Sequence, residues 1–132
     1  MKALIVEDDM SCTIILHKML QKYGNCTTAQ NGKQAIRAIA QALLDQDPFD
    51  LICLDIMMPE MDGHDALRKI RAAEGVASVG PENASRIVMM TALNDIKNVA
   101  RAFGEFADAY LVKPIDPAKL ETLLATFGIV PV

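Results

Sequence analysis

Short apolar runs alternate with segments of helical periodicity along this chain. The four clearest runs have the length of strands and span residues 3–6, 51–54, 87–90 and 110–112. A weaker strand is expected over residues 26–29. Apolar residues between the runs recur at a helical period, which predicts helices at 10–23, 32–44, 65–73, 94–103 and 117–127. The segment 74–85 has no period and is rich in Gly, Pro and small residues, so an exposed loop is expected there.

Strands and helices that alternate in this way are typical of a parallel sheet with helices on both faces. Strands that are apolar throughout fit such a sheet, because both of its faces are buried. The sequence therefore predicts an α/β fold, a flavodoxin-like three-layer sandwich with a five-stranded parallel sheet of order 2-1-3-4-5 and five helices. We expect one domain over residues 1–132, since no repeat or linker interrupts the pattern.

Each of the four apolar runs stops at a residue that can do chemistry. In chain order, the residues that follow or end these runs are Glu7, Asp8 and Asp9, then Asp55, Thr91 and Lys113. Because the carboxyl ends of parallel strands lie along one edge of a sheet, we expect these side chains to converge there. The sequence thus predicts a cluster of carboxylates with one hydroxyl and one ammonium beside it.

Such a cluster favours a hard divalent cation. Two unit charges about 4 Å apart repel by roughly 4 kcal/mol at an effective dielectric constant near 20, and Mg²⁺ with its oxygen ligands relieves that repulsion. A carboxylate such as Asp55 can also attack phosphorus and form an acyl phosphate. The Lys113 ammonium and the Thr91 hydroxyl would then neutralise and hydrogen-bond the phosphoryl oxygens.

Composition narrows the possible partners and compartment. The formal net charge is −4 and there is no basic block, which argues against a nucleic-acid-binding surface. No apolar run approaches the roughly 20 residues that span a bilayer, and no signal peptide is visible, so a cytoplasmic location without membrane contact is expected. Cys12, Cys26 and Cys53 lack metal-ligand spacing and are expected to be buried, reduced thiols.

Four sequence motifs together resemble one known family. They are Leu4-Ile5-Val6-Glu7-Asp8-Asp9, the stretch from Asp55 to Gly63 (DIMMPEMDG), Met90-Thr91-Ala92 and Tyr110-Leu111-Val112-Lys113-Pro114. Their order and spacing resemble the receiver domain of two-component response regulators, the CheY-like family, and the resemblance covers essentially the whole chain. CheY itself has the strand order 2-1-3-4-5.

The resemblance implies roles for the residues of the predicted site. Asp55 would be the phosphoacceptor, and Asp8 the direct Mg²⁺ ligand from the first strand, with Glu7 acting mainly through water. Together with Asp55, the backbone carbonyl of Met57 would complete the protein ligands. Lys113 would contact the phosphoryl group, and its bond to Pro114 resembles one that is cis in this family.

A switch is also implied by the resemblance. Thr91 would move toward the phosphate, and the ring of Tyr110 would turn inward to fill the vacated space. The output surface would be helix 4, strand 5 and helix 5, roughly residues 95–127. A histidine kinase or histidine phosphotransfer protein would donate the phosphoryl group, and a downstream effector protein would read the switch. A phosphorylation-dependent homodimer is a further form that such a domain could adopt.

Two other functions compete with the phosphorylation switch. An aspartyl-nucleophile phosphatase needs a second Asp two residues after the first, where this chain has Met57. A flavodoxin-like cofactor binder would have a phosphate-binding loop after the first strand, where the acids stand instead. We therefore expect a stand-alone receiver, ending at Val132 soon after its last helix, that catalyses only its own phosphorylation. Apolar Met57 and Leu93 cannot orient a water molecule, which predicts slow dephosphorylation.

Overall fold

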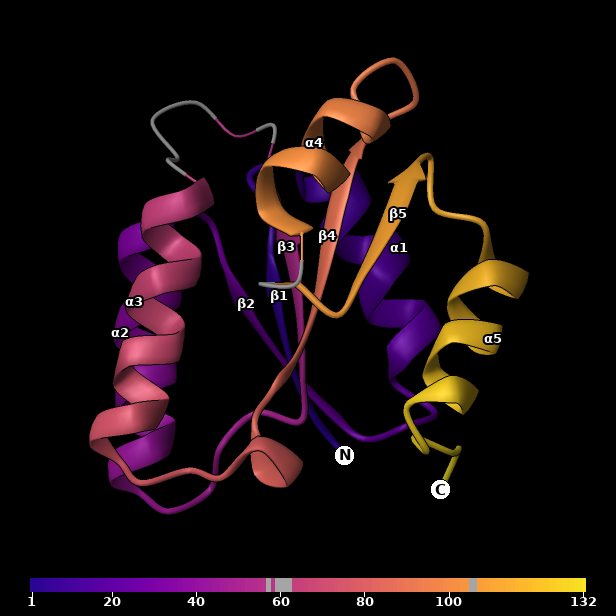
Figure 1. Ribbon diagram of the computed structural model, residues 1–132. Helices are drawn as coiled ribbons and strands as arrows, with labels where there is room; N and C mark the ends of the chain where they lie inside the picture. The colour runs from indigo at the N-terminus through magenta and orange to yellow at the C-terminus, as the bar shows by residue number, and fades with distance from the viewer. Residues whose placement is uncertain (57, 59–62, 105–106) are drawn as a thin grey trace.

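A parallel sheet forms the centre of the molecule (Figure 1). The computed structural model describes residues 1–56, 58, 63–104 and 107–132. Within them the sheet has five strands in the order β2-β1-β3-β4-β5, as the sequence predicts. The strands are β1 (Lys2–Val6), β2 (Asn25–Ala29), β3 (Leu51–Asp55), β4 (Arg86–Ala92) and β5 (Ala109–Lys113). Every neighbouring pair among them is parallel.

Helices cover both faces of this sheet (Figure 1). The α-helices in the described residues are α1 (Met10–Leu20), α2 (Gly32–Leu44), α3 (Gly63–Val76), α4 (Ile96–Phe103) and α5 (Pro117–Thr126). Buried side chains of α2, α3 and α4 share one core cluster, whereas those of α1 and α5 share another. The predicted three-layer α/β sandwich is therefore confirmed. None of the helices in the described residues is long and apolar enough to cross a membrane.

Alternate residues of each central strand enter the two cores. Leu4 and Val6 of β1 pack under α2 and α3, while Ala3 and Ile5 pack under α1 and α5. All four are fully buried. Side chains that alternate between two covered faces leave no polar side to a strand. This is the reason why the sequence shows continuous apolar runs here and not an alternation of apolar and polar residues.

Polar side chains define where three of the helices begin. Asp9, Asn31 and Asp116 each accept a hydrogen bond from a backbone N–H in the first turn of α1, α2 and α5, respectively. The predicted start of α5, with Pro117 in its first turn, is confirmed. Asp9 is the third acid after β1. Its role as the cap of α1 explains its presence without a part in the acidic site.

The expectation of an exposed loop over residues 74–85 is wrong at both ends. Helix α3 continues to Val76, and a short 3₁₀ turn covers Pro81–Asn83. Glu74 is only 5% exposed and Ser85 only 4%. The backbone N–H of Ser85 donates to the Glu74 carboxylate at 2.7 Å, so each polar group gives the other a partner inside the protein. A pairing between residues eleven positions apart leaves no periodic signal in the sequence.

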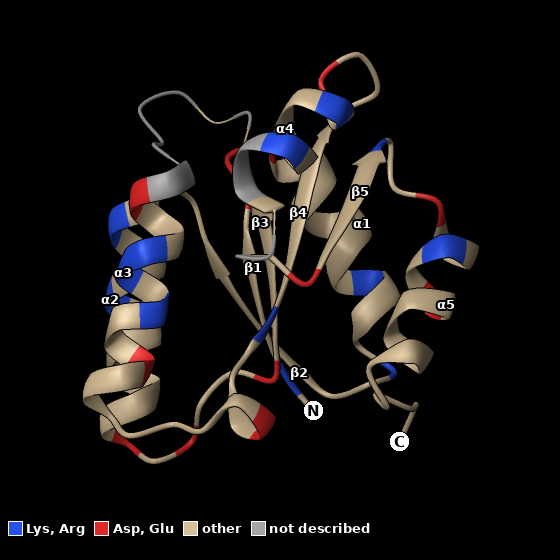
Figure 2. Ribbon diagram, in the orientation of Figure 1, with Lys and Arg blue, Asp and Glu red and all other residues tan. Residues whose placement is uncertain are grey.

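The apolar residues whose period predicts α1 do not all face the core. Leu16 and Leu20 are buried, but Ile14 and Ile15 of the same apolar pattern are each 49% exposed. Of the cysteines, Cys53 is buried and Cys12 and Cys26 are half-buried, all three as free thiols. Acidic and basic residues are interspersed over the helices (Figure 2).

Candidate functional site

The carboxyl ends of β1 and β3 bring the predicted acids together. The two strands are paired with Val6 opposite Leu54, so the next residues, Glu7 and Asp55, are neighbours. One carboxylate oxygen of each of these residues and of Asp8 lies within 4.8 Å of the others. Glu7 and Asp55 are buried, and Asp8 is exposed. Three hard oxygen donors at this spacing fit the ligand preference of Mg²⁺.

Lys113 approaches both buried acids from the other side of β4. Its Nζ lies 2.9 Å from Oδ2 of Asp55 and 2.7 Å from Oε2 of Glu7. The Lys113 side chain is 19% exposed, whereas the two carboxylates are 2% exposed or less. One ammonium thus faces two buried carboxylates, and if all three acids ionise, two negative charges of the cluster stay uncompensated.

The pKa values of the site reflect this imbalance of charge. Burial, together with a hydrogen bond to Asp55, raises the pKa of Glu7 from 4.5 to about 7. Burial alone would lower the pKa of Lys113, but its hydrogen bonds to Asp55 and Glu7 outweigh burial and raise that pKa. Lys113 therefore remains a cation at neutral pH, while Glu7 is poised to give up a proton when a metal ion or another cation arrives.

Thr91 supplies a buried hydroxyl beside the acids. It is fully buried in β4, and its Oγ1 has no hydrogen-bond partner among the described residues. A buried hydroxyl in this state costs about 1–3 kcal/mol, so an acceptor that enters the site would be favoured at this position. Ala92, the next residue, is small and half-buried.

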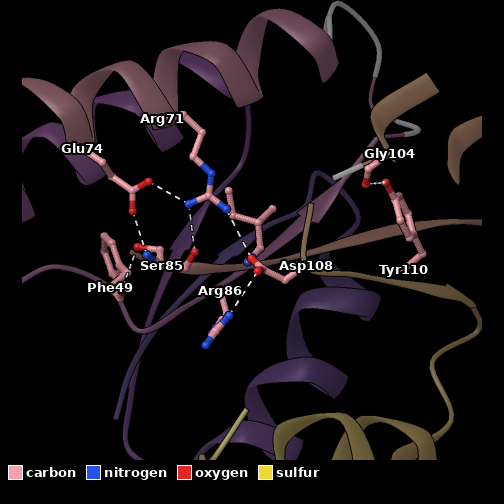
Figure 3. Close-up of polar contacts among 9 residues, drawn as sticks. Phe49, Arg71, Glu74, Ser85, Arg86, Gly104, Asp108 and Tyr110 are labelled. Carbon is pink, nitrogen blue, oxygen red and sulfur yellow. Dashed lines mark hydrogen bonds and ion pairs between the residues drawn. The ribbon is translucent and has the colours of Figure 1, made fainter. Parts of the chain in front are cut away.

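Tyr110 lies on the same face of the sheet as Thr91. Tyr110 of β5 pairs with Met89 of β4, and residues two apart in a strand face the same side. The Tyr110 hydroxyl donates a hydrogen bond of 2.8 Å to the carbonyl of Gly104, at the end of α4 (Figure 3). Burial also raises the pKa of Tyr110, which therefore keeps its proton as a donor.

Several sequence expectations fall near the site. The Lys113–Pro114 peptide bond is cis, as the resemblance implied. Leu93 is 74% exposed just after β4. The expected backbone ligand Met57 and most of the motif that follows it lie outside the described residues.

A polar network at the start of β4 and β5, the ends of these strands away from the site, was not predicted from the sequence. Arg71 of α3 contacts Glu74, Ser85 and Asp108, which come from three separate parts of the chain (Figure 3). The only sequence signal was a pair of charged residues at a helical spacing of three, Arg71 and Glu74, which more often indicates a solvent-exposed ion pair.

The chain belongs to the response regulator family. A sequence model of the response regulator receiver domain matches residues 3–125. Apart from Lys2, this match covers all five strands, and it includes the paired acids, Thr91 and Lys113 of the site. Receiver domains act in two-component signalling, where aspartate phosphorylation and Mg²⁺ binding are general features of the family. The expectation of a single domain over residues 1–132 stays a prediction, as does a cytoplasmic location.

Individual relatives agree with this assignment. The chain is 36% identical over 121 residues to a probable transcriptional regulator, ycf27, of Guillardia theta, which covers 91% of this chain and 42% of that protein. This chain spans only 25–45% of the length of the curated relatives that it matches. These relatives are named as transcriptional regulators, so they do not support the expectation of a protein that does not bind nucleic acid.

Solved structures of two receiver domains share the fold. One is the receiver domain of the sensor histidine kinase PA1611 of Pseudomonas aeruginosa, with a magnesium ion in its active-site cleft. Superposed on this chain, it gives a TM-score of 0.71 at 29% sequence identity, and the alignment covers 96% of this chain and 95% of that one. The other comes from the co-crystal structure of the Saccharomyces cerevisiae phosphotransfer protein Ypd1 with the receiver domain of Ssk1. Its TM-score is 0.77 at 26% identity, with 97% and 88% covered.

Proposed function

We propose that this receiver domain accepts a phosphoryl group on Asp55 from a phosphohistidine of a kinase or phosphotransfer protein, in a reaction that needs Mg²⁺. The observation that carries the proposal is the position of the Asp55 carboxylate, buried, 2.9 Å from the Lys113 ammonium and next to two further carboxylates. A nucleophile held between a fixed cation and a set of metal ligands is suited to phosphoryl transfer, where positioning and charge neutralisation dominate catalysis.

The transfer step follows from these groups. A carboxylate oxygen of Asp55 attacks phosphorus and forms an O–P bond, while the N–P bond to the donor imidazole breaks. The imidazole nitrogen leaves with the electron pair of that bond, and a proton from its own protein or from solvent completes the neutral ring. Lys113 is placed to balance negative charge on the phosphoryl oxygens.

The metal site would be formed by Asp8, Asp55 and Glu7. Bound Mg²⁺ would supply Lewis-acid neutralisation of the phosphoryl oxygens. Glu7 would respond to the cation by losing its proton, because its raised pKa of about 7 reflects burial among other carboxylates. Asp8 is the exposed member of the set, which suits a ligand at the entrance of the site.

The phosphorylated state would be read through Thr91 and Tyr110. A phosphoryl group adds up to about two negative charges and strong acceptors, and the unpartnered Thr91 hydroxyl is the one neutral side-chain donor in β4. Movement of Thr91 would leave space on the face of the sheet that Tyr110 shares. The output surface would be α4, β5 and α5, where a groove of about 370 Å³ runs between β5 and α5. We propose that a downstream protein partner binds this surface.

The donor protein would approach over α1. Met10, Ile14 and Ile15 of this helix are 57%, 49% and 49% exposed, and α1 begins immediately after the acids. Three exposed apolar side chains on one short helix beside a charged site mark an interaction surface. The similar receiver domain of Ssk1 was crystallised with a histidine phosphotransfer protein, which supports a donor of this class. Sustained phosphatase turnover is not proposed, because Met57 has no ionisable group for general acid–base catalysis.

Acetyl phosphate with Mg²⁺, followed by intact-mass measurement, tests the proposal. We expect the wild-type protein to gain the mass of one phosphoryl group and Asp55→Asn to gain none. Asp50→Asn serves as a matched control, because Asp50 is an exposed aspartate just before the same strand. An unchanged mass of the wild-type protein with acetyl phosphate and with a phosphorylated phosphotransfer domain would refute phosphoacceptance.

A further inference from the structure

The end of α4 and the start of β5 are held by two contacts of different kinds. At the end of α4, the carbonyl of Gly104 accepts one hydrogen bond, of 2.8 Å, from the Tyr110 hydroxyl. Just before β5, the carboxylate of Asp108 has several charged and backbone partners (Figure 3). Tyr110 thus holds a helix end through a neutral side-chain donor, whereas Asp108 is fixed by a charged network.

The Gly104 contact depends on a backbone conformation that favours glycine. Gly104 has φ of 46° and ψ of −123°, a combination that residues with a Cβ rarely adopt. A Cβ at this position would meet no atom within 4 Å, so the preference for glycine arises from the backbone and not from packing. Helix α4 has only eight residues, and Val99 is its most buried described side chain. A short helix with one buried side chain among those described has low local stability.

The Asp108 contact is much more extensive. Oδ2 accepts from the backbone N–H of Ile87 at 2.7 Å and lies 3.3 Å from Nη2 of Arg71. Oδ1 lies 3.4 Å from Nη1 of Arg86. The backbone N–H of Asp108 also donates to the carbonyl of Ile87, at 2.8 Å. The entry into β5 is therefore bound to the first residues of β4 by side chain and backbone together.

Arg71 is itself fixed by buried groups. Its Nη1 lies 2.7 Å from the Glu74 carboxylate and 3.1 Å from the carbonyl of Ser85. The hydroxyl of Ser85 donates to the carbonyl of Phe49 at 2.6 Å. Because Glu74 and Ser85 are almost fully buried, these contacts are screened little by water. The network ties Asp108 to α3 and to the starts of β3 and β4.

We propose that Asp108 is a fixed pivot and that the Tyr110–Gly104 hydrogen bond is a latch on α4. When Tyr110 turns away, the latch opens and α4 is released, while the Arg71–Asp108 network keeps the start of β5 in place. The network thus confines the movement to α4, and Arg71 and Asp108 act as positioning residues. The latch and pivot are properties of the unphosphorylated protein; only their use in signalling rests on the proposed function.

Hydrogen exchange of backbone amides in the unphosphorylated protein tests both parts. We expect Tyr110→Phe to raise the exchange rates in α4 (Ile96–Phe103) roughly two- to tenfold, the effect of losing one neutral hydrogen bond. The amides of Ile87 and Asp108 should keep their wild-type rates. Unchanged exchange in α4 would overturn the latch, and an equal rise at Ile87 and Asp108 would overturn the pivot.

Two glycines with positive φ provide a matched pair of variants. Gly104→Ala keeps the Tyr110 hydroxyl but strains the backbone that presents its acceptor, so exchange in α4 should rise as in Tyr110→Phe. Gly128→Ala introduces comparable strain after α5, where φ is 77° and a Cβ again meets no atom within 4 Å. This control should leave exchange in α4 unchanged. The same rise in α4 for both variants would show a general loss of stability and would overturn the latch.

Charge removal tests the pivot. Asp108→Asn retains an acceptor for Ile87 but loses its ion pair with Arg71, and we expect faster exchange of the Ile87 and Asp108 amides. Arg86→Gln, which removes the longest and most exposed of the three side-chain contacts of Asp108 and the contact of Arg86 with the Phe127 ring, should have a smaller effect. Equal effects of the two variants, or none, would contradict a pivot centred on Arg71 and Asp108.

The rate of phosphorylation by acetyl phosphate and Mg²⁺ connects the latch to signalling. Gly104→Ala should raise this rate roughly two- to tenfold, because the latched state is destabilised by about the net contribution of one hydrogen bond. If neither variant nor wild type is phosphorylated, the proposed function fails while the exchange results still decide the latch. If wild type is phosphorylated and Gly104→Ala is no faster, the latch has no part in the switch and this step of the inference is wrong.

Discussion

The ammonium of Lys113 lies 2.9 Å from the carboxylate of Asp55, although the two residues belong to strands separated by β4. Lys113 also forms an ion pair with Glu7, so one cation spans the carboxyl ends of three strands. This relationship couples nucleophile, metal ligand and counter-charge. Any change in one of these groups alters the electrostatic energy of the other two, which leads to the predictions below.

Removal of the ammonium should impair phosphorylation and leave the fold intact. We expect Lys113→Met to lower the rate with acetyl phosphate by at least about tenfold, since a charge-assisted contact to the phosphoryl group contributes roughly 1.5–3 kcal/mol. Time courses of intact mass measure this rate. Lys119→Met, an exposed lysine in α5, is the control. Equal rates for Lys113→Met and the wild type would contradict the role of Lys113.

Magnesium should stabilise the folded protein. At a tenfold excess of Mg²⁺ over its dissociation constant, linkage adds about 1.4 kcal/mol, which raises the melting temperature of a domain of this size by about 4 °C. Thermal unfolding with and without Mg²⁺ measures the shift. It should vanish in Asp8→Asn and persist in Asp9→Asn, because Asp9 caps α1. A full shift in Asp8→Asn would remove Asp8 from the ligand set.

The metal-free protein should lose stability as the pH rises from about 4.5 to about 7. Glu7 has a higher pKa in the folded protein, about 7, than its value of 4.5 without burial, so the folded state binds more protons in this range. Its favourable contribution is complete at pH values below 4.5 and is lost as pH passes 7. Denaturant unfolding at several pH values measures the slope. Glu7→Gln should flatten it, and an unchanged slope in that variant would assign the effect to other groups.

The exposed face of α1 should affect the rate of phosphoryl transfer from a protein donor and not the rate from acetyl phosphate. We expect Ile14→Asp to slow transfer from a phosphorylated phosphotransfer domain at least about tenfold, as a central apolar contact does, and to leave the acetyl phosphate rate unchanged. Leu44→Asp is the matched control, because Leu44 is an exposed apolar residue of α2. Slow reaction with both donors would indicate a damaged site and not a docking surface.

The acyl phosphate should be long-lived. Neither Met57 nor Leu93 can orient a water molecule, so we expect the phosphorylated protein to lose its phosphoryl group over many minutes in Mg²⁺. Intact mass after removal of acetyl phosphate follows the decay. Leu93→Gln should accelerate it, since Leu93 is exposed beside the site and tolerates a polar side chain. Decay of the wild type within seconds would contradict the prediction.

Local sequence patterns were sufficient to predict the architecture and the types of residue in the site. Apolar runs that end at Asp55, Thr91 and Lys113 predict both parallel strands and their shared edge, because strand direction places these ends together. The Asp116 cap and the start of α5 could be predicted for a similar reason, since they depend on residues close in sequence. Burial of Glu74 and exposure of Ile14 could not be predicted, because each depends on which distant element covers the residue.

The sequence by itself therefore determined which reactive residue stands at the end of each strand and the family to which the chain belongs. Only the tertiary structure decided that Lys113 contacts two acids and that Arg71 contacts Asp108. It also decided that the pKa of Glu7 is raised to about 7. The physical reason is that the energy of a charged group depends on distance and burial, and both are properties of long-range packing.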